Sequence, residues 1–264
     1  MIPQGQSATS SLSSRDRILI STCLVLVTVL AWAYLVHLDR QMSVEMEFHA
    51  AMGMSMMDMP WTTADVWFTF AMWTVMMAGM MAGSAAPVLL LFAASRAKRP
   101  GPGVKSSVLM FGLGYLAIWT GFSAVAALAQ WALHGAAMLS PTMAASSPYL
   151  AGAILIGAGA YQLTPFKGAC LTHCRSPLGF LMTNWRDGPF GAFLMGFRHG
   201  TYCLGCCWAL MCVLFVAGVM NLVWVGMLTG LVLIEKIGRT GIMVARLAGA
   251  VMLIVGIVKI VGAG

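Results

Sequence analysis

Apolar residues form long, nearly uninterrupted stretches along this chain instead of the alternating pattern of a sheet. Seven such runs occur, at residues 18–38, 66–94, 106–133, 149–164, 190–218, 221–237 and 243–262. A helix that crosses a bilayer needs about 20 apolar residues, and a backbone in lipid must satisfy its own hydrogen bonds. The pattern therefore predicts an all-α fold, a polytopic transmembrane helical bundle of about seven spans.

The composition supports the same class of protein. Hydrophobic residues make up 60% of the 264 positions and charged residues only 9%, whereas soluble domains have about 25% charged residues. The formal net charge of +7 would suit nucleic acid in a soluble chain, but the charges lie mostly between the apolar runs. We therefore expect the lipid bilayer as the surrounding partner and no nucleic acid.

Basic residues are concentrated on one side of the predicted bundle. They precede the first run and occupy every second connection: Arg15, Arg17, Arg96, Lys98, Arg99, Lys105, Lys167, Arg175, Arg186, Lys236 and Arg239. The remaining connections carry acidic residues with only Arg40, or no charge. The positive-inside rule thus predicts a cytoplasmic N-terminus. Arg15, Arg17 and Ala31-Trp32-Ala33 also fit a cleavable signal peptide, and its removal would leave six spans.

The chain is predicted to form one domain. Residues 1–17 are expected to be a disordered cytoplasmic tail, and residues 18–264 a single transmembrane bundle. Within the bundle we expect a Met-rich external loop at 39–65 and a Cys/His cytoplasmic loop at 165–189. The sequence contains neither a phosphate-binding Gly loop nor a Gly-x-Ser-x-Gly motif, so a role other than catalysis is favoured.

The 23 Met and 7 Cys residues are distributed unevenly along the chain. Methionines crowd the external loop, where an exposed side chain has no gap to fill, so His49, Met54 and Met56 are candidates to capture a soft metal. In the second run, Met72, Met76 and Met80 recur every four residues with Met77 and Met81 beside them. This spacing places them along one stripe of a helix. Core packing is the alternative explanation for the stripe.

The fifth run brings one imidazole and three thiols to one face. At 100° per residue, His199, Cys203, Cys206 and Cys207 fall within an arc of about 100°. Cu(I), Zn(II) and iron–sulfur centres all use such ligands. Two alternatives remain open: thiol exchange through a Cys203–Cys206 bridge, and ordinary packing. Arg198, a charge within the run, needs a partner and could stabilise thiolates.

Two further groups lie on the predicted cytoplasmic side. Cys170, His173 and Cys174 have a spacing that fits half a metal site, although incidental loop thiols would look the same. Glu235 and Lys236 end the sixth run and could pair with Arg198 or gate protons, but a pair whose side chains reach the membrane interface is the simpler interpretation. Small residues suit close helix contacts in the third and fourth runs: Gly112, Gly114, Gly152, Gly157 and Gly159.

Several stretches together resemble a bacterial domain-of-unknown-function family described as predicted metal-binding integral membrane proteins. They are Met-Trp-x-x-Met-Met-x-x-Met-Met at 72–81, Lys167–Gly179, His199–Trp208, and Gly218–Asn221 followed by Glu235-Lys236. The resemblance covers roughly residues 60–260. It implies a multi-pass protein of the bacterial cytoplasmic (inner) membrane that binds a metal.

Copper handling is the leading functional hypothesis, as transport or as delivery to a copper protein. The external loop would collect Cu(I), the Met stripe would lead it inward, and His199 with the three thiols would hold it. Thioether ligands favour Cu(I), with zinc or iron as alternatives. A periplasmic copper protein or a membrane enzyme complex would be the partner. The competing hypotheses are a membrane thiol-disulfide oxidoreductase and an auxiliary structural subunit.

Overall fold

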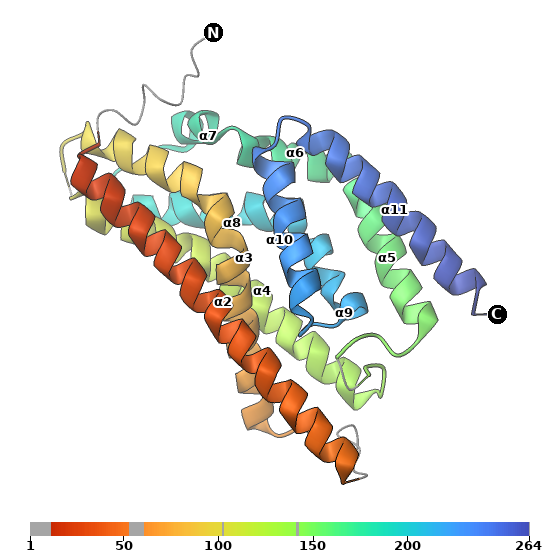
Figure 1. Cartoon of the computed structure of the whole chain (residues 1–264). Helices are drawn as coiled ribbons and strands as arrows, with labels where there is room; N and C mark the ends of the chain where they lie inside the picture. Colours follow the sequence, from red (N-terminus) through yellow and green to blue (C-terminus); the bar gives the residue numbers. More distant parts are fainter. Residues whose placement is uncertain (1–11, 53–60, 102, 141–142, 264) are drawn as a thin grey trace.

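The computed structural model describes residues 12–52, 61–101, 103–140 and 143–263, and over these residues the chain is helical apart from turns and one isolated bridge between Leu139 and Ala145. The helices are α2 (Ser14–Ala51), α3 (Thr63–Ala97), α4 (Val104–Gly135), α5 (Pro148–Gln162), α6 (Pro165–Arg175), α7 (Pro177–Asn184), α8 (Gly188–Cys212), α9 (Leu214–Ala217), α10 (Leu222–Ile237) and α11 (Gly241–Val261). They form one elongated bundle (Figure 1).

All seven apolar runs are helical, as the sequence predicts. Within the described residues, five helical stretches are long and apolar enough to cross a membrane: Ser14–Glu45, Thr63–Ala97, Val104–Gly135, Gly188–Ala217 and Gly241–Val261. Helices α5 and α10 match the runs at 149–164 and 221–237 but have only 15 and 16 residues. The all-helical fold is therefore confirmed, whereas the count of seven spans stays a prediction.

Three segments expected to be irregular are partly helical. Helix α2 begins at Ser14, inside the expected tail, and continues to Ala51, inside the expected external loop. No Gly or Pro interrupts the sequence between these two residues, so nothing breaks the helix where the apolar run ends. The expected cytoplasmic loop at 165–189 contains α6 and α7. Each begins with a Pro in its first turn, where the missing backbone donor costs nothing.

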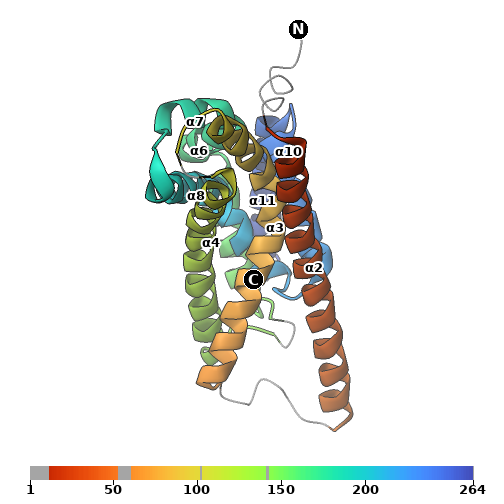
Figure 2. The ribbon, with the colours of Figure 1, turned by 90° about the vertical axis from the view of Figure 1, so that its left-hand side faces the viewer.

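The four groups of basic residues share one end of the bundle, called here the basic end (Figures 1 and 2). The start of α2, the α3–α4 connection, helices α6 and α7, and the α10–α11 connection all meet there. Direct contacts support this placement: the Arg99 guanidinium lies 4.0 Å from the ring centre of Trp185, and Arg175 donates to the Arg239 carbonyl at 3.5 Å.

Glycines allow the closest helix contacts in the bundle. Helix α4 packs along α8, and a Cβ added at Gly114 or Gly196 would collide with the backbone of the opposite helix. Helices α5 and α11 approach each other in the same way at Gly152 and Gly159. The expected role of small residues is therefore correct at these positions. At Gly112 and Gly157, no described atom of a neighbouring helix lies within 4 Å of an added Cβ.

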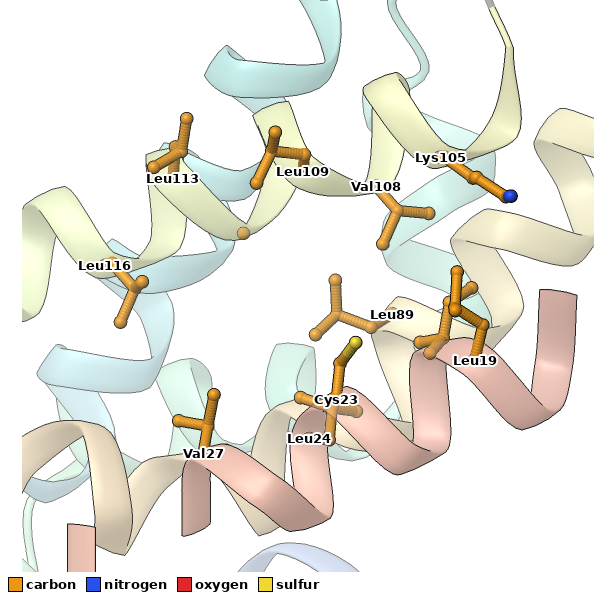
Figure 3. A pocket seen from close by; sticks show the side chains of 12 residues that line it. Leu19, Cys23, Leu24, Val27, Leu89, Lys105, Val108, Leu109, Leu113 and Leu116 are labelled. Atoms are coloured by element: carbon orange, nitrogen blue, oxygen red, sulfur yellow. The ribbon is translucent and has the colours of Figure 1, made fainter. Parts of the chain in front are cut away.

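Helix α2 packs on α3 but leaves an apolar groove between itself and α4 (Figure 3). The groove has a volume of about 300 Å³, and its walls are aliphatic apart from Gly112, the Cys23 thiol and the Lys105 side chain. Leu89 of α3 lies at its base. An aliphatic surface of this kind suits lipid tails and offers little metal-binding chemistry.

The α4–α8 contact makes a specific prediction. Gly114→Ala adds one methyl group that would overlap the carbonyl of Phe193, so we expect a loss of at least about 1–3 kcal/mol in the free energy of unfolding. Gly112→Ala is the matched control, because it adds the same methyl group two residues away in open space. Thermal unfolding midpoints of the purified variants measure the difference. Equal midpoints would show that the helices do not approach this closely.

Candidate metal centre

Helix α8 turns its imidazole and three of its four thiols into the bundle. His199 is 3% exposed, Cys203 and Cys207 are 1% exposed, and Cys206 is fully buried. Helical spacing alone predicts that these residues share a face, and their burial shows that this face points to the protein core. The chemistry of this face therefore depends on which neighbouring helices supply the residues opposite it.

Three other helices bring polar atoms to the thiols. The Cys174 sulfur on α6 lies 3.9 Å from the Cys206 sulfur. The Cys203 sulfur lies 2.9 Å from the Lys236 ammonium on α10 and 3.0 Å from the Tyr115 hydroxyl on α4. We call Cys174, Cys203, Cys206 and Cys207 the sulfur cluster. Its four sulfurs come from two helices that are separate in sequence.

The four sulfurs of the sulfur cluster lie in one region of the core but are not arranged around a common point. Within the described parts of the chain, no group of three or more His, Cys, Asp or Glu side chains is arranged to hold a metal ion. A local reason is visible: the thiols of Cys206 and Cys207 both donate to the Cys203 carbonyl, at 3.1 and 2.9 Å. Thiols bonded back to their own helix need a side-chain rotation before they can share a ligand.

His199 lies in an aromatic enclosure next to the sulfur cluster. The rings of Phe180, Tyr115 and Phe111 surround the imidazole, with ring centres 5.1, 6.0 and 6.2 Å away. Its Nδ1 atom is buried and has no hydrogen-bond partner among the described residues. Buried polar atoms are usually satisfied, so an unpaired ring nitrogen is a candidate to bind a ligand or a proton.

The methionine stripe of α3 lies in the same core as the thiols. Met72, Met76, Met77, Met80 and Met81 are all buried there. Met81 reaches the sulfur cluster through Lys236, whose ammonium lies 3.8 Å from the Met81 sulfur and 3.2 Å from the Ser84 hydroxyl. Burial suits core packing for the stripe as a whole, whereas the position of Met81 also places a thioether close to the thiols.

The Cys-x2-His-Cys group does not come together as a half-site. Cys174 points toward α8, and Cys170 faces Gly205, where an added Cβ would lie 2.8 Å from the Cys170 sulfur. His173 points outward and stacks on the ring of Tyr202 at 4.3 Å. Because this segment is a helix, consecutive residues point in different directions. The group therefore brings the Cys174 thiol to the sulfur of Cys206, whereas its imidazole contacts α8 only through the ring of Tyr202.

The candidate capture residues of the external loop are untested. Met54 and Met56 lie outside the described residues. His49 belongs to the last turns of α2, and its side chain is likewise not described. Their role in collecting metal stays a prediction.

Lys236 occupies the place beside the thiols that the sequence suggested for Arg198. Arg198 is exposed and lines a surface pocket with Asn184 and Arg186. Lys236 and Glu235, expected to extend to the membrane interface, are 7% and 1% exposed. That interpretation was wrong because hydropathy cannot reveal a partner from another helix, and each of these residues has one.

Glu235 is part of a buried polar network that the sequence did not reveal. Its carboxylate accepts from the Lys167 ammonium at 2.6 Å and from the Gln162 amide at 3.0 Å. Its carbonyl accepts from the Arg175 guanidinium at 2.7 Å. Lys167 lies in one of the stretches that carry the family resemblance, and this was the available signal for its importance.

No curated protein and no solved structure matches the chain. A family match does exist, and its region contains the methionine stripe, all four members of the sulfur cluster, His199 and the Lys167–Glu235 pair. Residues 70–259 match the PpoB2 family, described as copper chaperones, and because this match covers well over half of the 264 residues, the chain belongs to that family.

Proposed function

We propose that the protein holds Cu(I) at the sulfur cluster, inside a bundle embedded in the bacterial cytoplasmic membrane, and passes it to a copper protein. The observation that carries this proposal is the 3.9 Å contact between the sulfurs of Cys174 and Cys206. A metal–sulfur bond is about 2.3 Å long, so two thiolates on opposite sides of one metal lie about 4.6 Å apart. A modest side-chain movement would open the observed pair to that distance.

The surrounding donors suit the same ion. Cys203 and Cys207 can supply further thiolates, His199 an unpaired ring nitrogen, and Met81 a thioether. Cu(I) accepts all three ligand types, whereas Zn(II) rarely uses thioether. In this proposal the rest of the methionine stripe leads from the opposite end of the bundle, where His49, Met54 and Met56 collect copper. Cys170 and His173 would lie near the point of exchange at the basic end.

The proposed orientation has seven spans, a cytoplasmic N-terminus and the basic end in the cytoplasm. The distribution of basic residues supports it, because positively charged connections stay on the cytoplasmic side. Acidic residues lie at the other end, for example Asp65 at the start of α3.

Labelling in intact cells tests this orientation. An impermeant maleimide should modify a Thr63→Cys variant directly, and a Thr172→Cys variant only after the cells are permeabilised, since each of these exposed threonines marks one end of the bundle. The protein without either substitution is the control for labelling of the native cysteines. Direct labelling at position 172 with protection at position 63 would reverse the topology.

Ligand substitutions test the metal site. Cys174→Ser and Cys206→Ser should each weaken Cu(I) binding by more than about 100-fold, because loss of second-shell contacts alone costs 10–100-fold. Competition with a chromogenic Cu(I) chelator under anaerobic conditions measures this affinity. Cys23→Ser is the matched control, since Cys23 is exposed on α2 and far from the cluster in sequence. Unchanged affinity in both cluster variants would exclude this sulfur pair as the site.

A second candidate function, thiol-disulfide exchange, is favoured by the same contact. The two sulfurs are 3.9 Å apart and would have to approach to the roughly 2.05 Å of a disulfide. The partner of Cys206 in such a bridge would be Cys174, and not Cys203 as the sequence suggested. Mass analysis of protein exposed to air discriminates the functions: a Cys174–Cys206 bridge without copper favours exchange, and reduced thiols with one bound copper favour the chaperone role.

A further inference from the structure

A small cleft at the basic end opens next to the sulfur cluster. Its volume is about 170 Å³. It lies between α3, the α6–α7 junction and the end of α10, and its lining residues are Ser84, Pro87, Val88, Cys174, Arg175, Pro177, Lys236 and Ile237. Two of them, Cys174 and Lys236, also contact the thiols of Cys206 and Cys203. The cleft therefore connects the surface of the molecule with the buried cluster.

Rigid backbone shapes two of the cleft walls. Pro87 lies inside α3, where its ring cannot donate a backbone hydrogen bond and displaces the preceding turn. Pro177 lies in the first turn of α7. The Arg175 side chain is held in place because it donates a hydrogen bond to the backbone carbonyl of Glu235 at 2.7 Å. A cleft with walls held in this way is part of the fold and does not depend on a mobile loop.

The positive charge of the cleft indicates that it suits an anionic ligand. Among the residues that the structure describes, its lining contains two cations, Arg175 and Lys236, and no carboxylate. The nearest acidic group in the sequence, Glu235, directs its carboxylate to Lys167 instead. A free copper cation would be repelled by these two charges, whereas an anion would be attracted.

We propose that this cleft receives copper as an anionic complex of Cu(I) with two small-molecule thiolates. The inference rests on the proposed function and adds to its methionine route a second entrance, at the basic end, where copper arrives in this anionic form. A volume of about 170 Å³ accommodates the metal, its two sulfurs and their nearest carbons, and excludes a folded carrier domain. Cys174 stands at the junction between cleft and cluster, so it is the first protein thiol that an arriving complex meets.

The transfer is a ligand exchange that balances without an oxidant or a reductant. The incoming complex has two thiolates on one Cu(I) and a charge of −1. The thiols of Cys174 and Cys206 replace them one after the other, each forming a copper–sulfur bond as a carrier thiolate leaves. The protons of the two cysteines pass to the departing thiolates, which leave as neutral thiols. Copper stays Cu(I), and the bound state again has a charge of −1 beside Lys236.

Two copper sources test the inference on the full-length protein in lipid nanodiscs under anaerobic conditions. One is Cu(I) in excess glutathione, which forms the anionic thiolate complex, and the other is the cationic acetonitrile complex of Cu(I). Stopped-flow absorption of the copper–thiolate bond follows loading of the apoprotein. Arg175→Gln should slow loading from the glutathione complex by about tenfold and leave loading from the cation unchanged or faster.

Control variants separate charge from structure. Arg175→Lys keeps the charge and should restore most of the rate. Arg239→Gln removes an exposed charge from a residue whose carbonyl contacts Arg175 but which does not line the cleft, and it should leave both rates unchanged. Ser84→Leu narrows the cleft and should slow loading from both copper sources without lowering the final amount of bound copper.

The outcomes distinguish this inference from the proposed function. If neither source loads the parent protein, the proposed function fails. If the cation loads and the glutathione complex does not, the protein binds copper but the cleft inference is wrong. If Arg175→Gln slows loading from both sources equally, Arg175 has a purely structural role and the cleft inference is wrong.

Discussion

The buried ion pair between Lys167 and Glu235 is the interaction on which the candidate site depends. Both side chains are 1% exposed, and removal of one partner of such a pair costs about 3–5 kcal/mol because the other charge stays buried. Lys167 and Cys174 are two turns apart on α6, and Glu235 is followed directly by Lys236 on α10. One pair therefore sets the positions of two residues that contact the thiols of α8.

The sequence was a good guide to the fold because hydropathy is a local property. Every apolar run became a helix, and the four groups of basic residues share one end of the bundle, as their positions in every second connection predict. Helices α6 and α7 were missed because they are short, and eleven or eight residues give too few turns for a clear period. The polar end of α2 has no pattern of apolar residues, so the extension of this helix to Ala51 was not predicted. A helix can form without such a pattern.

The site was predictable only where one helix defines it. The period of α8 predicts that His199 and the three thiols share a face, and they do. Nothing in the sequence states which helix lies opposite this face, so Cys174 was grouped with His173 and the charge beside the thiols was assigned to Arg198. Contacts between Lys236 and Cys203, 33 residues apart, arise from packing and have no local signal.

The close approach of Cys170 to Gly205 has a consequence for how such a site can be lost. A methyl group on residue 205 would lie 2.8 Å from the Cys170 sulfur, so this thiol would have to turn away from α8. A side chain larger than a methyl group would also press on the Cys170 Cβ atom, which lies 3.5 Å from the added carbon, and would push α6 and Cys174 away from Cys206. A descendant of this chain could thus retain all four cysteines of the sulfur cluster and still lose the contact between Cys174 and Cys206 through one bulky side chain at position 205.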